Sequence, residues 1–217
     1  MTFITYKYII MLKMDTSIII SLPKPKLIGK MSIEEAIARR QSIRQFTQAS
    51  LTMEQLSQLL WSAQGITEQF RRAVPSAGAT YPLDIFAVIG IVEGANPGVY
   101  HYLPIKHSIE LIKKGDLRRD LSLAALNQEF IANAPLNIVI TGEYSRTTLR
   151  YGSRGEKYVH MEVGHAGQNL SLIAQTLGLG TVVIGAFIDE EVIRCLNLPK
   201  KFTPLYIMPF GYPQVTG

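Results

Sequence analysis

The chain of 217 residues predicts an α+β fold, and two observations support this. Strand-like apolar runs and amphipathic runs with helical periodicity follow one another without a regular strand–helix–strand alternation, which favours α+β over a doubly wound parallel sheet. Hydrophobic residues make up 47% of the chain and charged residues only 18%. Typical soluble domains have about 25% charged residues. This balance excludes a disordered chain and predicts that a second subunit covers part of the surface.

The first residues are expected to form a variable arm, residues 1–16, before one domain of residues 17–217. Charged residues interrupt the apolar runs of the arm, so none reaches the ~18 apolar residues of a membrane-spanning helix. Residues 17–22 are expected to form a strand that reaches across to a partner subunit. The single cysteine, Cys195, excludes an intramolecular disulfide framework. We therefore expect a cytoplasmic protein that does not contact a membrane.

Helix-start signals open two helices in the first third of the chain. Ser32 and Glu35 predict a capping box for a helix that ends near Gln41. Thr52 and Gln55 predict another, for a helix that stops at Gly65. Further helices are predicted over residues 117–125, over residues 158–177, and from an N-capping Asp189 to Leu196. The pair Gly164 and Gly167 inside the longest helix predicts close approach by another helix, since glycine weakens a helix interior.

Apolar runs bounded by turn residues predict the strands of the sheet. They cover residues 84–92, 99–103, 108–111, 136–142, 181–184 and 204–210, and the second and third of these read as a hairpin. A long loop, residues 66–82, connects the second helix to the first of these strands. It carries Arg71-Arg72 and a run of small residues.

Charge and motifs exclude several function classes. The formal net charge is +5, but the basic residues are scattered, so no nucleic-acid partner is expected. Gly178-Leu179-Gly180 follows a helix and precedes a strand, the reverse of the order in a dinucleotide fingerprint. The four histidines have no zinc-ligand spacing, and no metal site is expected.

Three side chains, Arg40, Ser42 and Arg44, are candidate ligands of one phosphate group. Guanidinium groups offer several donors and a permanent charge, and serine adds a short hydrogen bond. The alternative is a solvated basic helix end, which the helix dipole favours. The small residues of Pro75-Ser76-Ala77-Gly78-Ala79 and of Gly185-Ala186 would let the backbone approach a flat ring. Together these features suit a flat phosphorylated cofactor.

The order and spacing of several motifs resemble the nitroreductase superfamily of flavoproteins. They include Arg40-x-Ser42-x-Arg44-x-Phe46, Leu59 to Gly65, Pro75 to Pro82, Gly98 to Tyr102, Gly164-His165-x-x-Gln168-Asn169-Leu170, and Gly178 to Phe187. The last three are similar to the SagB-type dehydrogenase branch, which includes azoline oxidases of peptide natural-product pathways. The resemblance covers roughly residues 18–213.

This resemblance implies a nitroreductase-like fold: a central mixed or antiparallel sheet flanked by helices, in an intertwined homodimer with FMN at the subunit interface. Arg40, Ser42 and Arg44 would hold the phosphate and ribityl end of FMN. Pro75, Ser76, Ala77, Gly78 and Ala79, from the other subunit, would line the ring, and Ile184, Gly185 and Ala186 would meet its opposite side. The long helix would pack at the dimer interface.

Two departures from the family pattern bear on function. The chain lacks the basic pair that ends many nitroreductases, so phosphate binding would rely on the N-terminal arginines, with Arg71 or Arg72 as further candidates. Arg150-Tyr151 stands where azoline oxidases have Lys-Tyr, and arginine is a poor proton acceptor. Tyr151 is the candidate catalytic residue, as a proton donor near the substrate. The alternative reading is an ordinary surface tyrosine.

The function this implies is an FMN-dependent oxidoreductase that transfers hydride in ping-pong fashion. The hydride would pass from NAD(P)H through flavin N5 to a quinone, nitro or similar small acceptor. One alternative is a SagB-type dehydrogenase that oxidises a peptide azoline or a related substrate. Another is a non-catalytic flavin-binding module.

Overall fold

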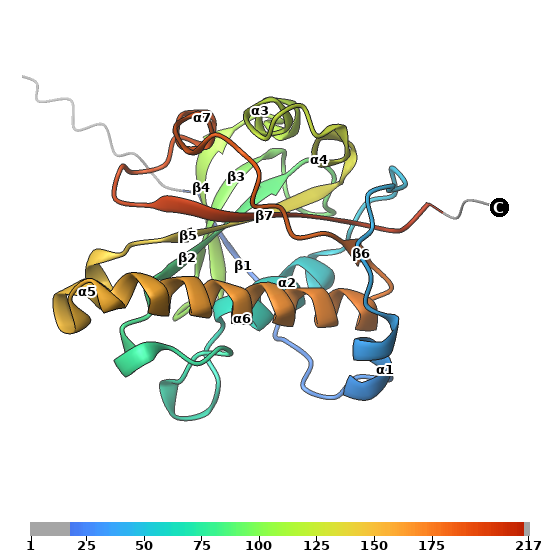
Figure 1. Cartoon of the computed structure of the whole chain (residues 1–217). Coiled ribbons are helices and arrows are strands. Elements are labelled where there is room, and N and C mark those ends of the chain that lie inside the picture. Colours follow the sequence, from blue (N-terminus) through green and yellow to red (C-terminus); the bar gives the residue numbers. More distant parts are fainter. Residues whose placement is uncertain (1–17, 215–217) are drawn as a thin grey trace, which may run out of the picture.

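The computed structural model describes residues 18–214 and confirms the α+β class (Figure 1). One seven-stranded antiparallel sheet has the order β1-β4-β3-β2-β5-β7-β6. Its strands are β1 (Ile19–Ser21), β2 (Leu83–Ile89), β3 (Gly98–Leu103), β4 (Ser108–Lys114), β5 (Leu136–Gly142), β6 (Gly180–Thr181) and β7 (Thr203–Gly211). The arm predicted for residues 1–16 lies outside the described residues.

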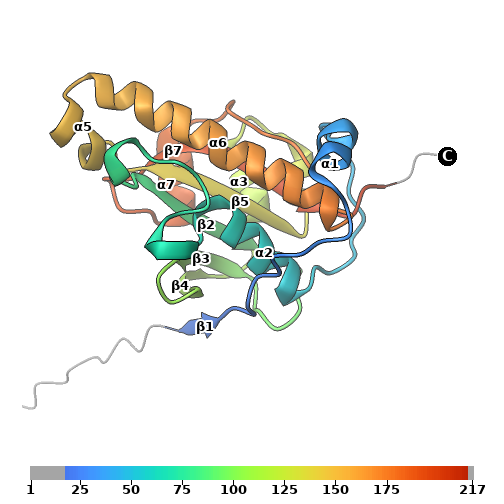
Figure 2. The ribbon, with the colours of Figure 1, turned by 90° about the horizontal axis from the view of Figure 1, so that it is seen from below.

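Helices cover both faces of the sheet (Figures 1 and 2). The helices are α1 (Ile33–Arg39), α2 (Met53–Gln64), α3 (Arg118–Ala124), α4 (Glu129–Asn133), α5 (Ser145–Tyr151), α6 (Arg154–Thr176) and α7 (Asp189–Leu196). On one face lie α2 and α6, and on the other lie α3, α4 and α7. Within the described part of the chain, no helix has the length and apolarity that crossing a membrane requires.

Burial on both faces explains the continuous apolar runs of the central strands. On β2, Ile85, Ala87 and Ile89 join the core under α2 and α6. Phe86 and Val88 alternate with them and join the core under α3 and α7. Because successive strand side chains point to opposite faces, a strand covered on both sides needs apolar residues at almost every position. All seven residues of β5 are buried for the same reason.

Local signals fixed several helix ends as predicted. The Thr52 hydroxyl accepts a hydrogen bond from the Gln55 backbone, and the Gln55 side chain accepts one from Thr52, so the capping box is complete. At α1, the Ser32 hydroxyl accepts from the Glu35 backbone. Beyond α6, Gly178 adopts a left-handed φ of +70°, which lets the chain turn away without a Cβ clash.

Two helix boundaries differ from the prediction. The longest helix begins at Arg154 rather than at Tyr158, and a separate helix, α5, precedes it. Gly152, with φ +57° and ψ −149°, separates the two helices. The sequence of α5 lacks an apolar stripe, because only Thr147 of its seven residues is buried, so periodicity gave no signal. At α7, Ile188 occupies the N-cap without a side-chain hydrogen bond, and Asp189 is the first helical residue.

Other expectations about contacts need correction. Strand β1 pairs with β4 of its own chain rather than with a partner subunit. Of the predicted strand 181–184, only Thr181 lies in a strand, β6, and Ile184 adds one bridge to β7. A Cβ on Gly167 would meet the Tyr206 ring at 3.2 Å, so that glycine admits a strand side chain rather than a helix. The close helix approach occurs instead at Gly155, against the α5 backbone.

Candidate functional site

The segment after α1 carries the candidate phosphate ligands along the edge of the sheet. Ser42 forms a parallel bridge with Thr181, and the Ile43 amide donates to the Thr181 carbonyl at 2.9 Å. Helix α1 has already ended at Arg39, so the following backbone is not helical. Alternate residues of an extended segment point the same way, which suits Arg40, Ser42 and Arg44 as a set. All three are exposed.

Ile184, Gly185 and Ala186 follow Thr181 along β7, in the direction away from Phe46, because Thr181 pairs with Phe210, Ile184 with Ile207 and Phe46 with Pro213. Ile184 exchanges two backbone hydrogen bonds of 3.0 Å with Ile207 of β7. The Gln128 side chain donates to the Ala186 carbonyl at 2.9 Å, which fixes the end of the turn. Gly185 and Ala186 are exposed, and a Cβ on Gly185 would meet nothing within 4 Å. The backbone here is therefore open to a flat ligand.

The arginines at this edge differ in whether an acidic side chain already pairs with them. Arg39 is paired with Glu35 on its own helix, at 2.6 Å. Among residues 18–214, neither Arg40 nor Arg44 takes part in an ion pair. Arg44 also lines an open hollow of about 630 Å³ next to Phe46 and Gln214. An anion can bind such arginines without breaking an existing pair.

The third predicted group, Pro75–Ala79, forms a short 3₁₀ turn held by α5. The Arg150 guanidinium donates to the Gly78 carbonyl at 3.0 Å, and the hydroxyls of Thr80 and Thr147 lie 2.8 Å apart. Gly78 has a left-handed φ of +58°. Ala77 and Gly78 keep backbone amides that no other described backbone group binds.

Tyr151, the candidate catalytic residue, lies directly over this turn. A Cβ placed on Gly78 would come 2.4 Å from the Tyr151 hydroxyl and 2.8 Å from Arg150 Nη1. The Tyr151 ring stacks edge-on against Tyr158 at 5.1 Å between centroids. A Cβ would require the ends of the Tyr151 and Arg150 side chains to shift, and the φ of +58° would strain any residue other than glycine. The structure thus brings Tyr151 together with the ring-lining turn that the sequence predicted.

The two halves of the predicted site lie apart within one chain. Figure 2 shows α1 at one end of α6 and α5, with the 66–81 loop, toward the other end. Arg40 and Ser42 follow α1, whereas Gly78 and Tyr151 lie at α5. Arg72 belongs to the second half, since it donates to the Gln64 carbonyl at 3.1 Å and lies over the Tyr81 ring. The expectation that Arg72 joins Arg40 at one phosphate is therefore not met within a single chain.

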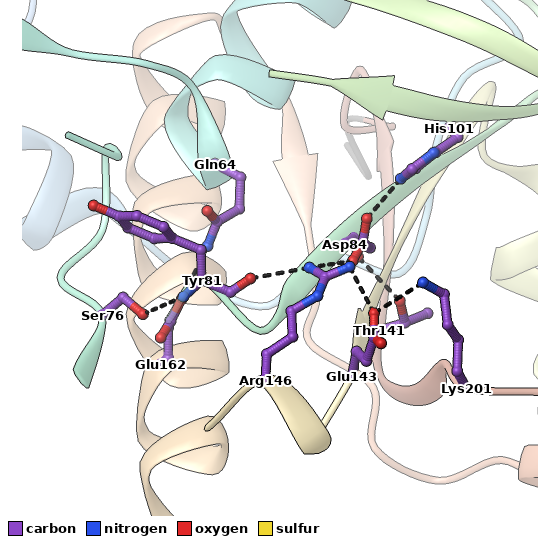
Figure 3. Close-up of polar contacts among 10 residues, drawn as sticks. All are labelled: Gln64, Ser76, Tyr81, Asp84, His101, Thr141, Glu143, Arg146, Glu162 and Lys201. Carbon is purple, nitrogen blue, oxygen red and sulfur yellow. Dashed lines mark hydrogen bonds and ion pairs between the residues drawn. The ribbon is translucent and has the colours of Figure 1, made fainter. Parts of the chain in front are cut away.

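A charged network ties α5 to the sheet and to the end of the loop (Figure 3). Arg146 forms ion pairs with Asp84 at 2.8 Å and with Glu143 at 2.7 Å, and donates to the Tyr81 carbonyl at 3.0 Å. His101 contacts the other oxygen of Asp84, and Lys201 contacts Glu143. Burial raises the pKa of Glu143, but Lys201 and Arg146 outweigh it and leave that pKa below its usual value.

A buried carboxyl group, Glu162 of α6, lies behind the ring-lining turn. Only 2% of the residue is exposed. Gln64 Nε2 donates to its Oε1 at 3.3 Å. Burial raises the Glu162 pKa to about 7, against the opposing effects of Ser76, Gln64 and Arg72.

Sequence reasoning missed both Glu162 and the Arg146 network. The network joins residues from β2, β3, the turn after β5, α5 and the loop before β7, and no local pattern connects them. Glu162 did leave a signal: it stands three residues after Val159 and four before Ala166, on the buried stripe of α6. The position of a charged residue within an apolar stripe indicates that the residue is buried, and buried charged residues are rare without partners. Within the described part of the chain, no cluster of three or more metal-ligand side chains is present.

Comparison with known proteins places this geometry in a family. The nitroreductase family profile matches residues 37–212. MJ1384 of Methanocaldococcus jannaschii, which carries the name nitroreductase, is 46% identical over 185 residues, or 85% of this chain and 92% of that protein. The microcin B17-processing protein McbC of Escherichia coli is 29% identical over 65% of this chain, which spans only 54% of McbC. An NADPH-dependent FMN reductase of Bacillus subtilis is 24% identical over 82% of this chain and 65% of its own length.

Solved structures agree with the fold. A protein of Ralstonia eutropha described as a nitroreductase superposes with a TM-score of 0.80 at 28% identity, over 91% of this chain and 90% of its own. The match to McbC supports the resemblance to the SagB-type branch. The sequence, the antiparallel sheet with helices on both faces, and these relatives agree, and this chain belongs to the nitroreductase family of oxidoreductases.

Proposed function

We propose that this chain is an FMN-dependent oxidoreductase that moves hydride from NAD(P)H to a quinone, nitro or similar small acceptor. One observation carries the proposal: Arg40 and Arg44, which form no ion pair among the described residues, flank Ser42, and Ser42 bridges to Thr181, from which the chain continues to the exposed backbone of Gly185 and Ala186. The exposed arginines offer a place for an anionic group, and the exposed backbone after Ile184 offers one for a flat ring. The FMN reductase and nitroreductase relatives support the same chemistry.

The residues present fit FMN. Arg40 and Arg44 offer charge-assisted donors that no ion pair within residues 18–214 occupies, and Ser42 offers an exposed hydroxyl, which together match a phosphate. At Gly185 the space that a Cβ would occupy is empty, so a ring can lie against the backbone. When bound, FMN would supply the hydride chemistry, and the protein would position and tune it.

A homodimer would complete this site. The turn Pro75–Ala79 and Tyr151 lie at the far end of α6 from Arg40, so we propose that a second copy supplies them to each FMN. Exposed apolar side chains support burial against another chain: Leu27 is 80% exposed, Ile28 90% and Leu149 89%. Clusters of exposed apolar residues are typical of protein interfaces.

The side chains over Gly78 would then meet the substrate. The Tyr151 hydroxyl would donate a proton to the acceptor as it is reduced, which requires hydrogen-bond reach of the reacting atom. Arg150 would hold the turn through the Gly78 carbonyl, since a permanently charged guanidinium does not accept a proton.

Oxidation of a peptide azoline is the second candidate, and the likeness to McbC favours it. The pair Arg150-Tyr151 occupies the right place beside the turn. Arginine in place of lysine argues against proton abstraction by that residue, so reduction of a small acceptor remains the preferred proposal.

An absorption spectrum of the purified protein, followed by anaerobic reduction with NADH and with NADPH, tests the proposal. We expect a flavin spectrum that bleaches with a nicotinamide and recovers with a quinone. A protein that stays colourless after FMN is added would refute it. Reduction by neither nicotinamide, with no reoxidation by quinones, would instead support a non-catalytic flavin-binding module.

Arg40→Ala tests the phosphate contacts. Loss of a charged hydrogen bond costs about 1.5–3 kcal/mol, so FMN affinity should fall roughly 10- to 150-fold. Arg39→Ala is the matched control, because Arg39 is already paired with Glu35. Equal FMN affinities of the two variants, measured by quenching of flavin fluorescence, would remove Arg40 from the site.

A further inference from the structure

A cluster of arginines and tyrosines extends from the Gly78 turn across the corner between α5 and α6. The Arg150 guanidinium donates to the Gly78 carbonyl at 3.0 Å, and its Cζ lies 5.4 Å from the centre of the Tyr151 ring. The Tyr151 and Tyr158 rings meet edge to face, with 5.1 Å between their centroids. Arg154 Cζ in turn lies 5.8 Å from the centre of the Tyr158 ring. We call Arg150, Tyr151, Arg154 and Tyr158 the corner cluster.

The two arginines of the corner cluster can take an anion without losing an existing partner. Both are exposed, and within residues 18–214 neither takes part in an ion pair. A guanidinium group that lies over an aromatic ring keeps the N–H donors in its own plane available. Arg150 uses one of its donors on the Gly78 carbonyl, which leaves the others for a ligand.

The nearby acidic side chain, Glu156, faces away from the corner cluster. Residues four apart on a helix share a face, so Arg154 stands with Tyr158, and Glu156 stands with His160. His160 Nε2 lies 2.5 Å from the Tyr144 hydroxyl, and burial together with the charge of Glu156 raises the pKa of Tyr144. The carboxylate of Glu156 therefore belongs to the Tyr144 side of α6 and does not neutralise Arg154.

Arg154 stands where a helix does not favour a cation. It is the first residue of α6, and the helix dipole disfavours basic side chains at that end. The chain just before it is open, because Gly152 is exposed and a Cβ there would meet nothing within 4 Å. A cation that the fold itself does not need, beside open space, suits an anionic ligand.

The proposed function gives this anion a chemical identity. In that proposal the Gly78 turn lies against the flavin, so a nicotinamide donor has to reach the flavin beside this turn. Figure 2 shows the corner between α5 and α6 beside the 66–81 loop. The corner cluster begins at the turn and leads away from it, which is where the rest of the donor would extend. Nicotinamide dinucleotides carry a pyrophosphate there, and NADPH adds a 2′-phosphate, a group for which arginine is the usual partner.

We propose that Arg154, with Arg150 and Tyr158, forms a subsite for the phosphate groups of the nicotinamide donor and favours NADPH over NADH. The inference rests on the proposed function, in which a nicotinamide reduces the flavin. A terminal phosphate carries about two negative charges at neutral pH, and arginine meets it with paired charge-assisted hydrogen bonds. The Tyr158 ring holds the Arg154 guanidinium in place. The subsite binds the donor and leaves the transfer of hydride to other groups.

Steady-state kinetics of wild type, Arg154→Gln and Arg154→Lys test the subsite. We expect wild type to use NADPH with a higher kcat/KM than NADH. Arg154→Gln should lower kcat/KM for NADPH about tenfold, the lower end for loss of a charged hydrogen bond, at unchanged kcat. The value for NADH should fall by a smaller factor, because NADH lacks the 2′-phosphate. Arg154→Lys should recover part of the loss, since lysine keeps the charge but not the paired donors.

Arg119→Gln is the matched control for these kinetics. Arg119 is an exposed arginine of α3, a helix on the opposite face of the sheet from α6. Its replacement changes the net charge equally and should keep the wild-type preference. A wild type that prefers NADH, or an Arg154→Gln that keeps the preference of wild type, would overturn the inference. A fall in kcat/KM for the acceptor instead of the donor would overturn it as well.

Titration calorimetry with adenosine 2′,5′-bisphosphate separates the inference from the proposed function. This probe carries phosphate groups but no nicotinamide, so its binding does not depend on reduction of a flavin. The purified full chain is titrated whether or not it holds flavin. Binding about tenfold weaker to Arg154→Gln than to wild type supports the subsite. Equal affinities, or no binding by wild type, would overturn it. A chain that binds the probe but takes up no FMN would overturn the proposed function alone.

Discussion

Arg146 joins three parts of the molecule, and replacing it with methionine is expected to destabilise the fold. The side chain is 33% exposed and contacts Asp84, Glu143 and the Tyr81 carbonyl. Methionine keeps the stem and its packing while it removes the charge and the donors. Asp84, whose side chain is 13% exposed, would keep only its contact with His101. Glu143 would keep Lys201.

The magnitude follows from the burial of these groups. Exposed ion pairs contribute about 0–1 kcal/mol, and loss of one partner from a fully buried pair costs about 3–5 kcal/mol. The Arg146 network lies between these limits, and it includes one hydrogen bond from a charged group, worth about 1.5–3 kcal/mol. We expect Arg146→Met to cost about 3 kcal/mol. For a domain of this size, that lowers the melting temperature by roughly 6–12 °C.

Chemical denaturation of wild type, Arg146→Met and the control Arg150→Met measures the effect. Arg150 lies one turn further along α5, is exposed, and makes one hydrogen bond to Gly78. Its loss should cost less than about 1 kcal/mol. A double-mutant cycle with Asp84→Asn should show coupling, because the two side chains are in contact. If Arg146→Met costs no more than Arg150→Met, the network does not hold α5 and the reasoning is wrong.

Three further predictions concern the turn and the buried carboxyl group. Gly78→Ala should lower the free energy of unfolding by at least 1–2 kcal/mol, because Gly78 has φ +58° and a Cβ would collide with Tyr151. Unchanged stability would mean that Tyr151 is not held over Gly78. Tyr151→Phe should lower the rate of acceptor reduction about 100-fold at unchanged FMN affinity, and an unaltered rate would exclude it as proton donor. The Glu162 pKa is raised from 4.5 to about 7 in the fold, so its contribution to stability is complete below pH 4.5 and is lost as pH rises through 7. That loss is about 3 kcal/mol, and Glu162→Gln should be spared it when unfolding is followed at pH 5 and at pH 8.5.

Much of the fold was predictable because its signals are local. The strands β2 and β5 could be recognised in the sequence as apolar runs, because both faces of each strand are covered. Helix α2 was defined by its capping box, and α6 ended at Gly178 as expected. Helices α4 and α5 were missed, because helices of five and seven residues are too short to show an apolar stripe. The existence of α5 depends on packing against α6 at Gly155.

The candidate site, too, was predictable from the sequence only in part. The residues Arg40, Ser42 and Arg44 and the small residues near Gly78 and Gly185 stood out by type and spacing alone. No pattern along the chain indicated that Ser42 would pair with Thr181, or that Tyr151 would lie over Gly78. Those neighbours are set by the order of strands in the sheet and by the turn between α5 and α6.

The sequence by itself determined the α+β class, most element boundaries and the residues suited to a phosphate and a flat ring, because capping, periodicity and side-chain chemistry act over a few residues. Only the tertiary structure decided which of these residues meet. It paired Ser42 with Thr181 and put the Gly78 turn beside Tyr151, toward opposite ends of α6. It also decided the state of Glu162, because burial by α2 and the loop, rather than anything in the local sequence, raises the pKa of that carboxyl group.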